Sequence, residues 1–255
     1  MRTPESEGGI ASIAIITISK DDPSGLERTL ASIDRQTDPP TELALVRAGQ
    51  SCDAAVDPSC ARHVFEVADP GRGISAAFNA AIEACSAEWV MFLNGGDELL
   101  RSDCLARLAH ACNASAGMDI VTCRAATDAG TALPRLTPRT PCEFLYVSHQ
   151  ASLFRRKLFS TVGPYSEQFR IRMDLDWMAR YLLSHGTGRI AFVDEAVVRY
   201  PLDGISSNSL IGFHLEELRV LCRSLRLAPA LFGFAVRRVP GRLLRDGWRR
   251  MTRWS

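Results

Sequence analysis

The sequence lacks the features that mark membrane-spanning, exported or nucleic-acid-binding proteins. No run approaches the ~18 apolar residues that a transmembrane helix requires. Residues 1–9 contain no apolar stretch of the kind that directs secretion, so we expect no export signal. Internal repeats and low-complexity segments are also missing. The formal net charge is only +1 over 255 residues, which argues against a nucleic-acid partner.

Cysteine pairs at the spacing of metal or redox motifs are absent as well. The chain has eight cysteines, and none forms a C-x-x-C pair. Several fall in apolar stretches typical of buried helices and strands. A chain of this length can build a core without disulfides, so we expect buried free thiols in the reducing cytoplasm.

Short apolar runs alternate with amphipathic stretches through the first half of the chain. Residues 13–18, 43–46, 63–67, 89–93 and 118–123 are predicted strands. Helices are expected from Pro23, over residues 75–85 and from a Ser102 cap. This alternation predicts an α/β fold with a mostly parallel sheet and helices on both faces. No G-x-G-x-x-G follows the first strand, which argues against a dinucleotide-dependent oxidoreductase.

The second half is less regular. Residues 124–142 are rich in proline and threonine, which predicts a long loop of the functional or mobile kind. Beyond it we expect a strand over 151–154, a helix over 174–184, short strands over 190–193 and 196–200, and a helix over 209–227.

Polar and acidic residues follow the apolar run 90–93 at once, in the order Asn94, Gly95, Gly96, Asp97. Ligands of open α/β sheets bind just beyond the carboxyl ends of strands. A carboxylate placed there can hold a hard cation, which in turn can hold a diphosphate. The simpler interpretation is a tight turn closed by an acid.

Taken in order, a series of motifs makes the chain resemble family 2 glycosyltransferases over residues 13–207. These nucleotide-sugar-dependent enzymes have the GT-A fold. The motifs are residues 16–21 with Gln36, residues 72–74 with Asn79, residues 89–97, 149–151, 163–165 with Phe169, 174–176 and 204–207.

The resemblance implies a Rossmann-like fold of the nucleotide-diphospho-sugar transferases, a mixed, mostly parallel sheet flanked by helices. It implies one GT-A domain over residues 10–207, with a nucleotide-binding half over 10–123 and an acceptor half over 124–207. Residues 208–255 would then form a C-terminal helical extension.

The family places its catalytic base where this chain has Asp174. An inverting sugar transfer needs one carboxylate to take the acceptor's hydroxyl proton. The alternative is that Asp174 only stabilises the start of a helix, and Asp176 is interpreted as a supporting or capping group.

The resemblance also implies a donor site and a divalent cation, Mg²⁺ or Mn²⁺, held by Asp97. The residues expected to bind the nucleotide-sugar are Thr17, Ser19, Asp21, Arg72, Asn79, Asn94 and His149. The alternative for His149 is a hydrogen-bonded structural residue.

The chain departs from the family pattern where acids are usual, since those positions hold Arg47, Gly71, Ala76, Asn94 and Gly96. These departures motivate a second hypothesis, a catalytically silent relative that binds a nucleotide, a glycan or a partner protein as a scaffold.

A basic segment closes the chain. Residues 237–255 contain seven arginines and one aspartate, and apolar residues recur near helical spacing. This pattern favours an amphipathic helix on an anionic membrane, at its cytoplasmic face. A solvated tail or a helix docked on the domain is the alternative. Membrane contact fits an enzyme that glycosylates polysaccharide or lipid-linked precursors.

Overall fold

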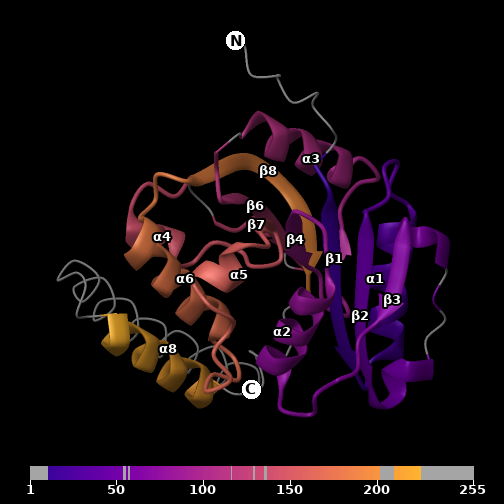
Figure 1. Cartoon of the computed structure of the whole chain (residues 1–255), viewed down its shortest axis with the longest axis horizontal. Helices are drawn as coiled ribbons and strands as arrows, with labels where there is room; N and C mark the ends of the chain where they lie inside the picture. Colours follow the sequence, from indigo (N-terminus) through magenta and orange to yellow (C-terminus); the bar gives the residue numbers. More distant parts are fainter. Residues whose placement is uncertain are drawn as a thin grey trace, which may run out of the picture.

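A mixed eight-stranded sheet forms the middle layer of the part of the chain that the computed structural model describes, residues 11–53, 56, 58–115, 117–128, 130–134, 137–201 and 210–224 (Figure 1). The strand order is β3-β2-β1-β4-β7-β6-β8-β5. The strands are β1 (Ile13–Lys20), β2 (Glu42–Ala48), β3 (His63–Glu66), β4 (Trp89–Phe92), β5 (Glu98–Leu99), β6 (Ile120–Thr127), β7 (Ser152–Arg155) and β8 (Ile190–Tyr200).

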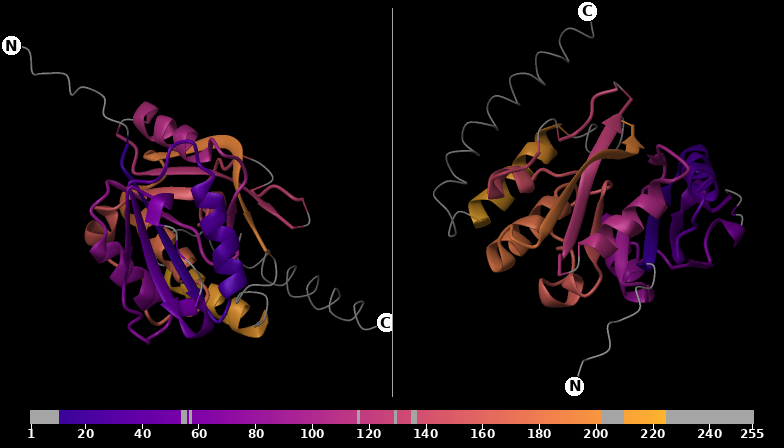
Figure 2. Two further views of the ribbon diagram at one scale, coloured as in Figure 1. Left: turned by 90° about the vertical axis from the view of Figure 1, so that its right-hand side faces the viewer. Right: turned by 90° about the horizontal axis from the view of Figure 1, so that it is seen from above.

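Helices cover both faces of the sheet. The longer ones are α1 (Pro23–Asp34), α2 (Ile74–Ala84), α3 (Cys104–Ala114), α6 (Met173–His185) and α8 (Leu210–Ser224), and the short ones are α4 (Pro141–Phe144) and α5 (Leu158–Thr161). The apolar sides of α1 and α3 pack on one face. Those of α2 and α6 pack on the other, and α8 lies beside α6 (Figures 1 and 2). The predicted layered α/β fold is confirmed.

Four of the seven strand pairings are parallel. Strand β1 runs parallel to both β2 and β4, β2 to β3, and β6 to β8. Strand β7 is antiparallel to β4 and β6, and β5 is antiparallel to β8. Because β1, β2 and β4 share one direction, their carboxyl ends meet at one edge of the sheet. Ligands of such sheets bind at that edge.

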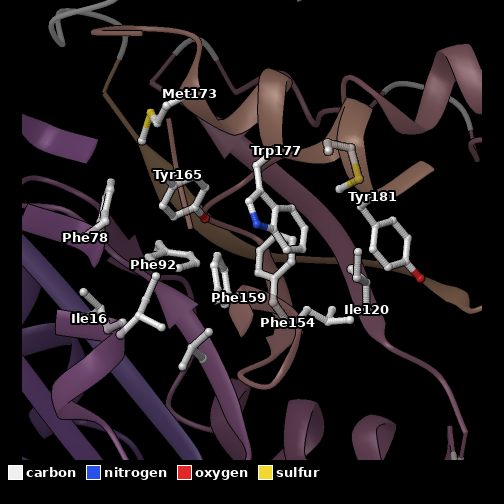
Figure 3. Packing of buried hydrophobic residues seen from close by; sticks show 14 of the residues in the cluster. Ile16, Phe78, Phe92, Ile120, Phe154, Phe159, Tyr165, Met173, Trp177 and Tyr181 are labelled. Atoms are coloured by element: carbon white, nitrogen blue, oxygen red, sulfur yellow. The ribbon is translucent and has the colours of Figure 1, made fainter. Parts of the chain in front are cut away.

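An aromatic cluster joins the two halves of the predicted 10–207 domain (Figure 3). Phe92 of β4 lies 4.9 Å, centroid to centroid, from Phe78 of α2 and 5.6 Å from Tyr165, which precedes α6. Trp177 of α6 packs edge-on against Phe154 of β7 at 5.4 Å. Offset and edge-on aromatic pairs add stability beyond the area they bury. The cluster therefore fixes α6 against the centre of the sheet.

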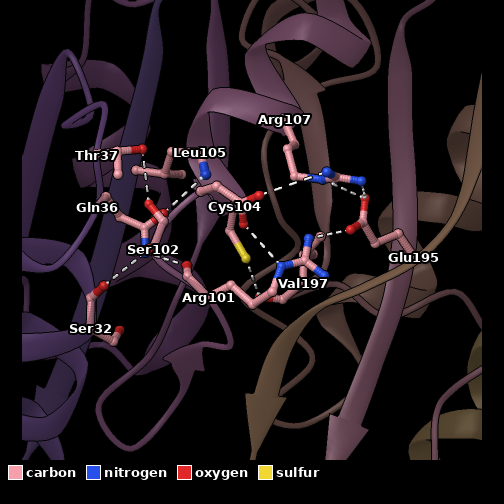
Figure 4. Close-up of polar contacts among 11 residues, drawn as sticks. Ser32, Gln36, Thr37, Arg101, Ser102, Cys104, Leu105, Arg107, Glu195 and Val197 are labelled. Carbon is pink, nitrogen blue, oxygen red and sulfur yellow. Dashed lines mark hydrogen bonds and ion pairs between the residues drawn. The ribbon is translucent and has the colours of Figure 1, made fainter.

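A polar network on the opposite face ties α1 and α3 together (Figure 4). The buried Gln36 side chain donates to the carbonyl of Arg101 at 2.7 Å and accepts from the amide of Leu105 at 3.1 Å. Glu195 of β8 accepts from Arg107 at 3.0 Å and pairs with Arg101. Gln36 thus satisfies the amide of Leu105, one of those that the start of α3 leaves without a helical partner.

The structure corrects several predicted elements. The first residues of the expected loop over 124–142 belong to β6, which extends to Thr127. Its last residues belong to α4, which begins with a capping box formed by Thr140 and Glu143. The two short strands expected over 190–193 and 196–200 form one strand, β8, whose pairing with β6 shifts register beside Arg124. The N-cap of α3 is Asp103 rather than Ser102.

The cysteine prediction holds in large part. All eight are free thiols and six are buried, but Cys52 and Cys222 are exposed. None of the described helices is long and apolar enough to cross a bilayer. The motif at 204–207 and the basic segment 237–255 lie outside the described residues.

Candidate active site

Three predicted donor residues lie where β1 ends. Thr17 is fully buried, and among the described residues its hydroxyl has no hydrogen-bond partner. Ser19 shares a 2.8 Å hydrogen bond with Ser51. Asp21, in the left-handed region at φ 56°, accepts from the amide of Gln50 at 3.1 Å. Ser19 and Asp21 therefore join the ends of β1 and β2, while Thr17 retains an unused oxygen.

The turn from Asn94 to Asp97 lies next to this strand end. The amide of Asn94 donates to Asp97 Oδ2 at 2.9 Å. The hydroxyl of Thr29 on α1 donates to the carbonyl of Asn94 at 3.0 Å and accepts from the amide of Gly96 at 2.9 Å. The acid therefore does close a tight turn, as the simpler interpretation holds.

Backbone geometry explains why glycines stand in this turn. A Cβ on Gly95 would lie 2.6 Å from the hydroxyl of Ser19, which is too close. Gly96 has φ 96°, a conformation that side chains other than glycine rarely adopt. An acid at position 96 would therefore be strained in the loop conformation seen here.

Oxygen atoms at this turn suit part of a cation site. Asp97 is only 4% exposed, and burial raises the pKa of its carboxyl to about 8. The side-chain oxygen of Asn94 is buried and has no hydrogen-bond partner among the described residues. No cluster of three or more His, Cys, Asp or Glu occurs in the described part of the chain. Asn94 and Asp97 fit a cation that takes its other ligands from water and phosphate.

Asp174 stands in the first turn of α6, which packs on the other face of the sheet from α1, the helix that contacts the 94–97 turn. Its Oδ1 accepts from the amide of Leu175 at 2.7 Å, which fixes the carboxylate plane. The partial positive charge at a helix N-terminus favours a carboxylate there. Asp174 also lines a cavity of about 10 Å³, together with Leu145, Val147, His149, Phe154, Tyr165, Trp177 and Met178.

His149 belongs to the aromatic cluster. Its ring stacks on Phe92 with centroids 4.4 Å apart, and its Nε2 lies 2.7 Å from the hydroxyl of Tyr165. Burial lowers the pKa of His149 to about 4, against the opposing effect of Asp174. Burial and Asp174 together raise the pKa of Tyr165. Both groups are therefore neutral at physiological pH. The structure thus gives His149 a hydrogen-bonded place in the core, beside Asp174 rather than at the strand-end turn.

The other two predicted donor residues contact the loop that precedes α6. Asn79 of α2 binds the backbone of Tyr165 twice, each time at 2.9 Å, so both ends of its amide are engaged. Arg72 forms two hydrogen bonds with Glu167 at 3.0 and 3.1 Å on the exposed surface. The structure thus shows both residues binding protein, and a donor contact by either stays a prediction.

The sequence alone missed the partners of this loop. Tyr165 belongs to a recognised motif, but nothing in the pattern pairs it with His149. Asp176, interpreted as a supporting group, binds Arg180, whose other nitrogens hold the carbonyls of Val162 and Pro164 at 2.8 and 2.7 Å. Arg47, which replaces a usual acid, donates to the carbonyl of Cys52 at 3.1 Å and pairs with Glu66. The contacts of His149 with Tyr165, of Arg180 with the two carbonyls and of Arg47 with Glu66 join residues 16 to 19 positions apart.

Comparison with known sequences gives consistent matches. A family model described as Glycosyl transferase family 2 matches residues 12–174. A "PGL/p-HBAD biosynthesis glycosyltransferase" of Mycobacterium tuberculosis is 30% identical over 230 residues, which cover 84% of this chain and 86% of the relative. Its counterpart in Mycobacterium bovis matches equally well.

Solved structures share the fold. Staphylococcus aureus TarS superposes with a TM-score of 0.63 at 15% identity, over 83% of this chain but only 39% of TarS. A shorter form of TarS in complex with UDP gives 0.61 at 15% identity, over 86% of this chain and 66% of that one. The mannosyltransferase PcManGT of Pyrobaculum calidifontis, in complex with GDP-Man and Mn²⁺, gives 0.62 at 16% identity, over 92% and 71%. These likenesses confirm the GT-A fold.

Proposed function

Because the chain belongs to glycosyl transferase family 2, we propose that Asp174 is the general base of an inverting transfer from a nucleotide-sugar donor to an acceptor hydroxyl. The chain is a glycosyltransferase by its family and its relatives. The observation that supports the assignment of the base is the position of Asp174 in the first turn of α6, where one backbone amide binds its carboxylate beside a water-sized cavity.

Each step of the reaction has a candidate residue. Asp174 takes the proton of the acceptor hydroxyl as that oxygen attacks the anomeric carbon, and the nucleoside diphosphate leaves from the opposite side. The buried neutral pair of His149 and Tyr165 lines the same cavity as Asp174, on its inner side. No second carboxylate is required, because a single displacement has no covalent intermediate.

The donor would lie at the carboxyl ends of β1 and β4, in the 10–123 half. Thr17 and Asn94 each present a buried oxygen without a partner among the described residues. The ribose hydroxyls of the donor, or a cation bound to its phosphates, would supply the missing partners. Ser19 and Asp21 would shape this edge. Arg72 would exchange Glu167 for the pyrophosphate, a task suited to a guanidinium. The 124–207 half would then hold the acceptor.

A divalent cation, Mg²⁺ or Mn²⁺, would be held by Asp97 and Asn94 together with the donor phosphates. When bound, it would neutralise charge on the leaving diphosphate. Both side chains supply oxygen, the atom that these cations prefer.

The C-terminal sequence and the family support a proposal for the acceptor class and the location. We propose a glycan or lipid-linked acceptor, reached from the cytoplasmic face of a membrane. The arginine-rich residues 237–255, which lie outside the described residues, would bind the anionic surface.

Asp174→Asn tests the assignment of the base. Loss of a general base typically lowers turnover about 10²- to 10⁴-fold, and donor affinity should stay within about threefold because the carboxylate acts on the acceptor. Turnover is measured as nucleoside diphosphate release over a panel of nucleotide-sugars, and binding by calorimetry. Asp103→Asn, the same change at the N-cap of α3, is the matched control and should retain turnover.

Retained turnover in Asp174→Asn would remove the assignment of the base. Donor binding by the unaltered protein without transfer or hydrolysis in any condition would favour the scaffold hypothesis instead.

A further inference from the structure

Helix α8 is hydrogen-bonded to the segment that precedes α6, the helix that contains Asp174. The Glu216 carboxylate accepts three backbone amides in a row, from Arg170 at 3.0 Å, Ile171 at 2.8 Å and Arg172 at 2.9 Å. Glu216 is 9% exposed, so these bonds are shielded from water. The residue lies beyond the 12–174 stretch that carries the family match.

This contact supplies what the start of α6 lacks. Arg172 occupies the N-cap position, and its side chain makes no capping hydrogen bond. Amides at and before a helix start need partners from elsewhere. Here a charged acceptor on another helix provides them, and hydrogen bonds to a charged group are stronger than neutral ones. Asp174 follows only two residues after the last of the three amides.

A second set of contacts from α8 holds the same point. The guanidinium of Arg172 lies 4.4 Å from the ring centroid of Phe213 and 3.4 Å from the carboxylate of Glu217. Both the backbone and the side chain of Arg172 are therefore fixed by α8.

We propose that Glu216 is a positioning residue for the transfer reaction. Its carboxylate sets where α6 begins and so the direction in which Asp174 meets the acceptor hydroxyl. The inference rests on the proposed role of Asp174 as general base. A shift of about 1 Å in a reacting group can cost about 100-fold in rate.

Glu216→Gln tests this role, with Glu42→Gln as the matched control. Glu42 is equally buried, at 5% exposed, and also accepts backbone amides, from Ser86 at 2.9 Å and Ala87 at 3.2 Å, but it lies on β2 away from Asp174. Glutamine keeps the shape and leaves one acceptor oxygen instead of two. Both variants should therefore melt at lower temperature than the unaltered protein.

The two variants should differ in turnover. At a temperature where circular dichroism shows both folded, Glu216→Gln should lower kcat about 10- to 100-fold with little change in the donor KM, and Glu42→Gln should leave kcat unchanged. Glu216→Asp keeps the charge but shortens the side chain by one methylene, so its kcat should lie between that of Glu216→Gln and that of the unaltered protein.

Equal kcat values for Glu216→Gln and Glu42→Gln would overturn the positioning role. If Glu216→Gln does not fold, Glu216→Asp decides, since a kcat equal to that of the unaltered protein in that variant would overturn it too. The assignment of Asp174 as the base is tested separately, because only an active Asp174→Asn variant would contradict it. An inactive Asp174→Asn beside a fully active Glu216→Gln removes the positioning role alone.

Discussion

Single polar residues around the site are distinguished by whether their hydrogen-bonding atoms are already used. The side chain of Asn79 is hydrogen-bonded to the backbone of Tyr165, and that of Arg72 to the carboxylate of Glu167. Thr17 and Asn94 each keep a buried oxygen without a partner in the described residues. A buried polar atom without a partner costs roughly 1–3 kcal/mol, so these two are the atoms that a bound donor would satisfy. The sequence placed all four in one donor site and could not separate them.

Asp97 gives a prediction at the same scale. Burial raises the pKa of its carboxyl to about 8, so at neutral pH it is mostly protonated without donor, and only the ionised form binds a cation well. The gain in donor affinity on adding Mn²⁺ should therefore increase from about pH 6 to about pH 9. Calorimetry with a nucleoside diphosphate measures it.

Asp97→Asn should reduce this gain and remove its dependence on pH, because an amide does not titrate. Asp128→Asn, a change of an exposed acid at the end of β6, serves as the control. A cation effect that is flat over this pH range in the unaltered protein would contradict the assignment of Asp97.

At the scale of elements, the apolar pattern was sufficient to predict helices and strands that bury one face. The apolar spacing predicted a helix over 75–85, and α2 spans Ile74–Ala84. The apolar run before Asn94 predicted β4, which ends at Phe92. The sequence failed where partners come from distant parts of the chain. β6 extends to Thr127, past its expected end, and β8 joins two expected strands into one, because the two strands pair with each other along their length, which no local pattern records.

In the candidate site, too, local motifs were predictable from the sequence and contacts between distant residues were not. Asp174 was found because a family motif marks it, and its place at a helix start was visible in the acidic first turn. Glu216 was missed because its partners lie 44 to 46 residues earlier and are backbone amides, which leave no trace in side-chain identity. The sequence alone suggested that Gly96 marks a lost metal ligand. Its φ of 96° adds a backbone reason for glycine at this position, because other residues are strained there.

At the scale of the whole molecule, both hydrophobic clusters contain residues from 10–123 and from 124–207, so the two predicted halves pack as one body. The cluster around Phe92 and Trp177 contains residues from α2, β4, β7 and α6. We propose that the basic segment 237–255, which lies outside the described residues, provides the membrane contact.

Removing residues 237–255 should weaken binding to vesicles that contain anionic lipid, and more strongly at low salt, because surface charges are screened as ionic strength rises. Co-sedimentation with anionic and with neutral vesicles measures this, and the neutral vesicles are the control. Equal partitioning of the full chain and the shortened chain would exclude the membrane contact.

The most direct test of the two-sided site is a crystal structure of the protein with a non-hydrolysable nucleotide-sugar. We expect the diphosphate beside Thr17, Asn94 and Asp97 at the ends of β1 and β4, with the anomeric carbon facing Asp174 from the other side. A diphosphate bound away from this edge, or a sugar turned away from Asp174, would contradict the account.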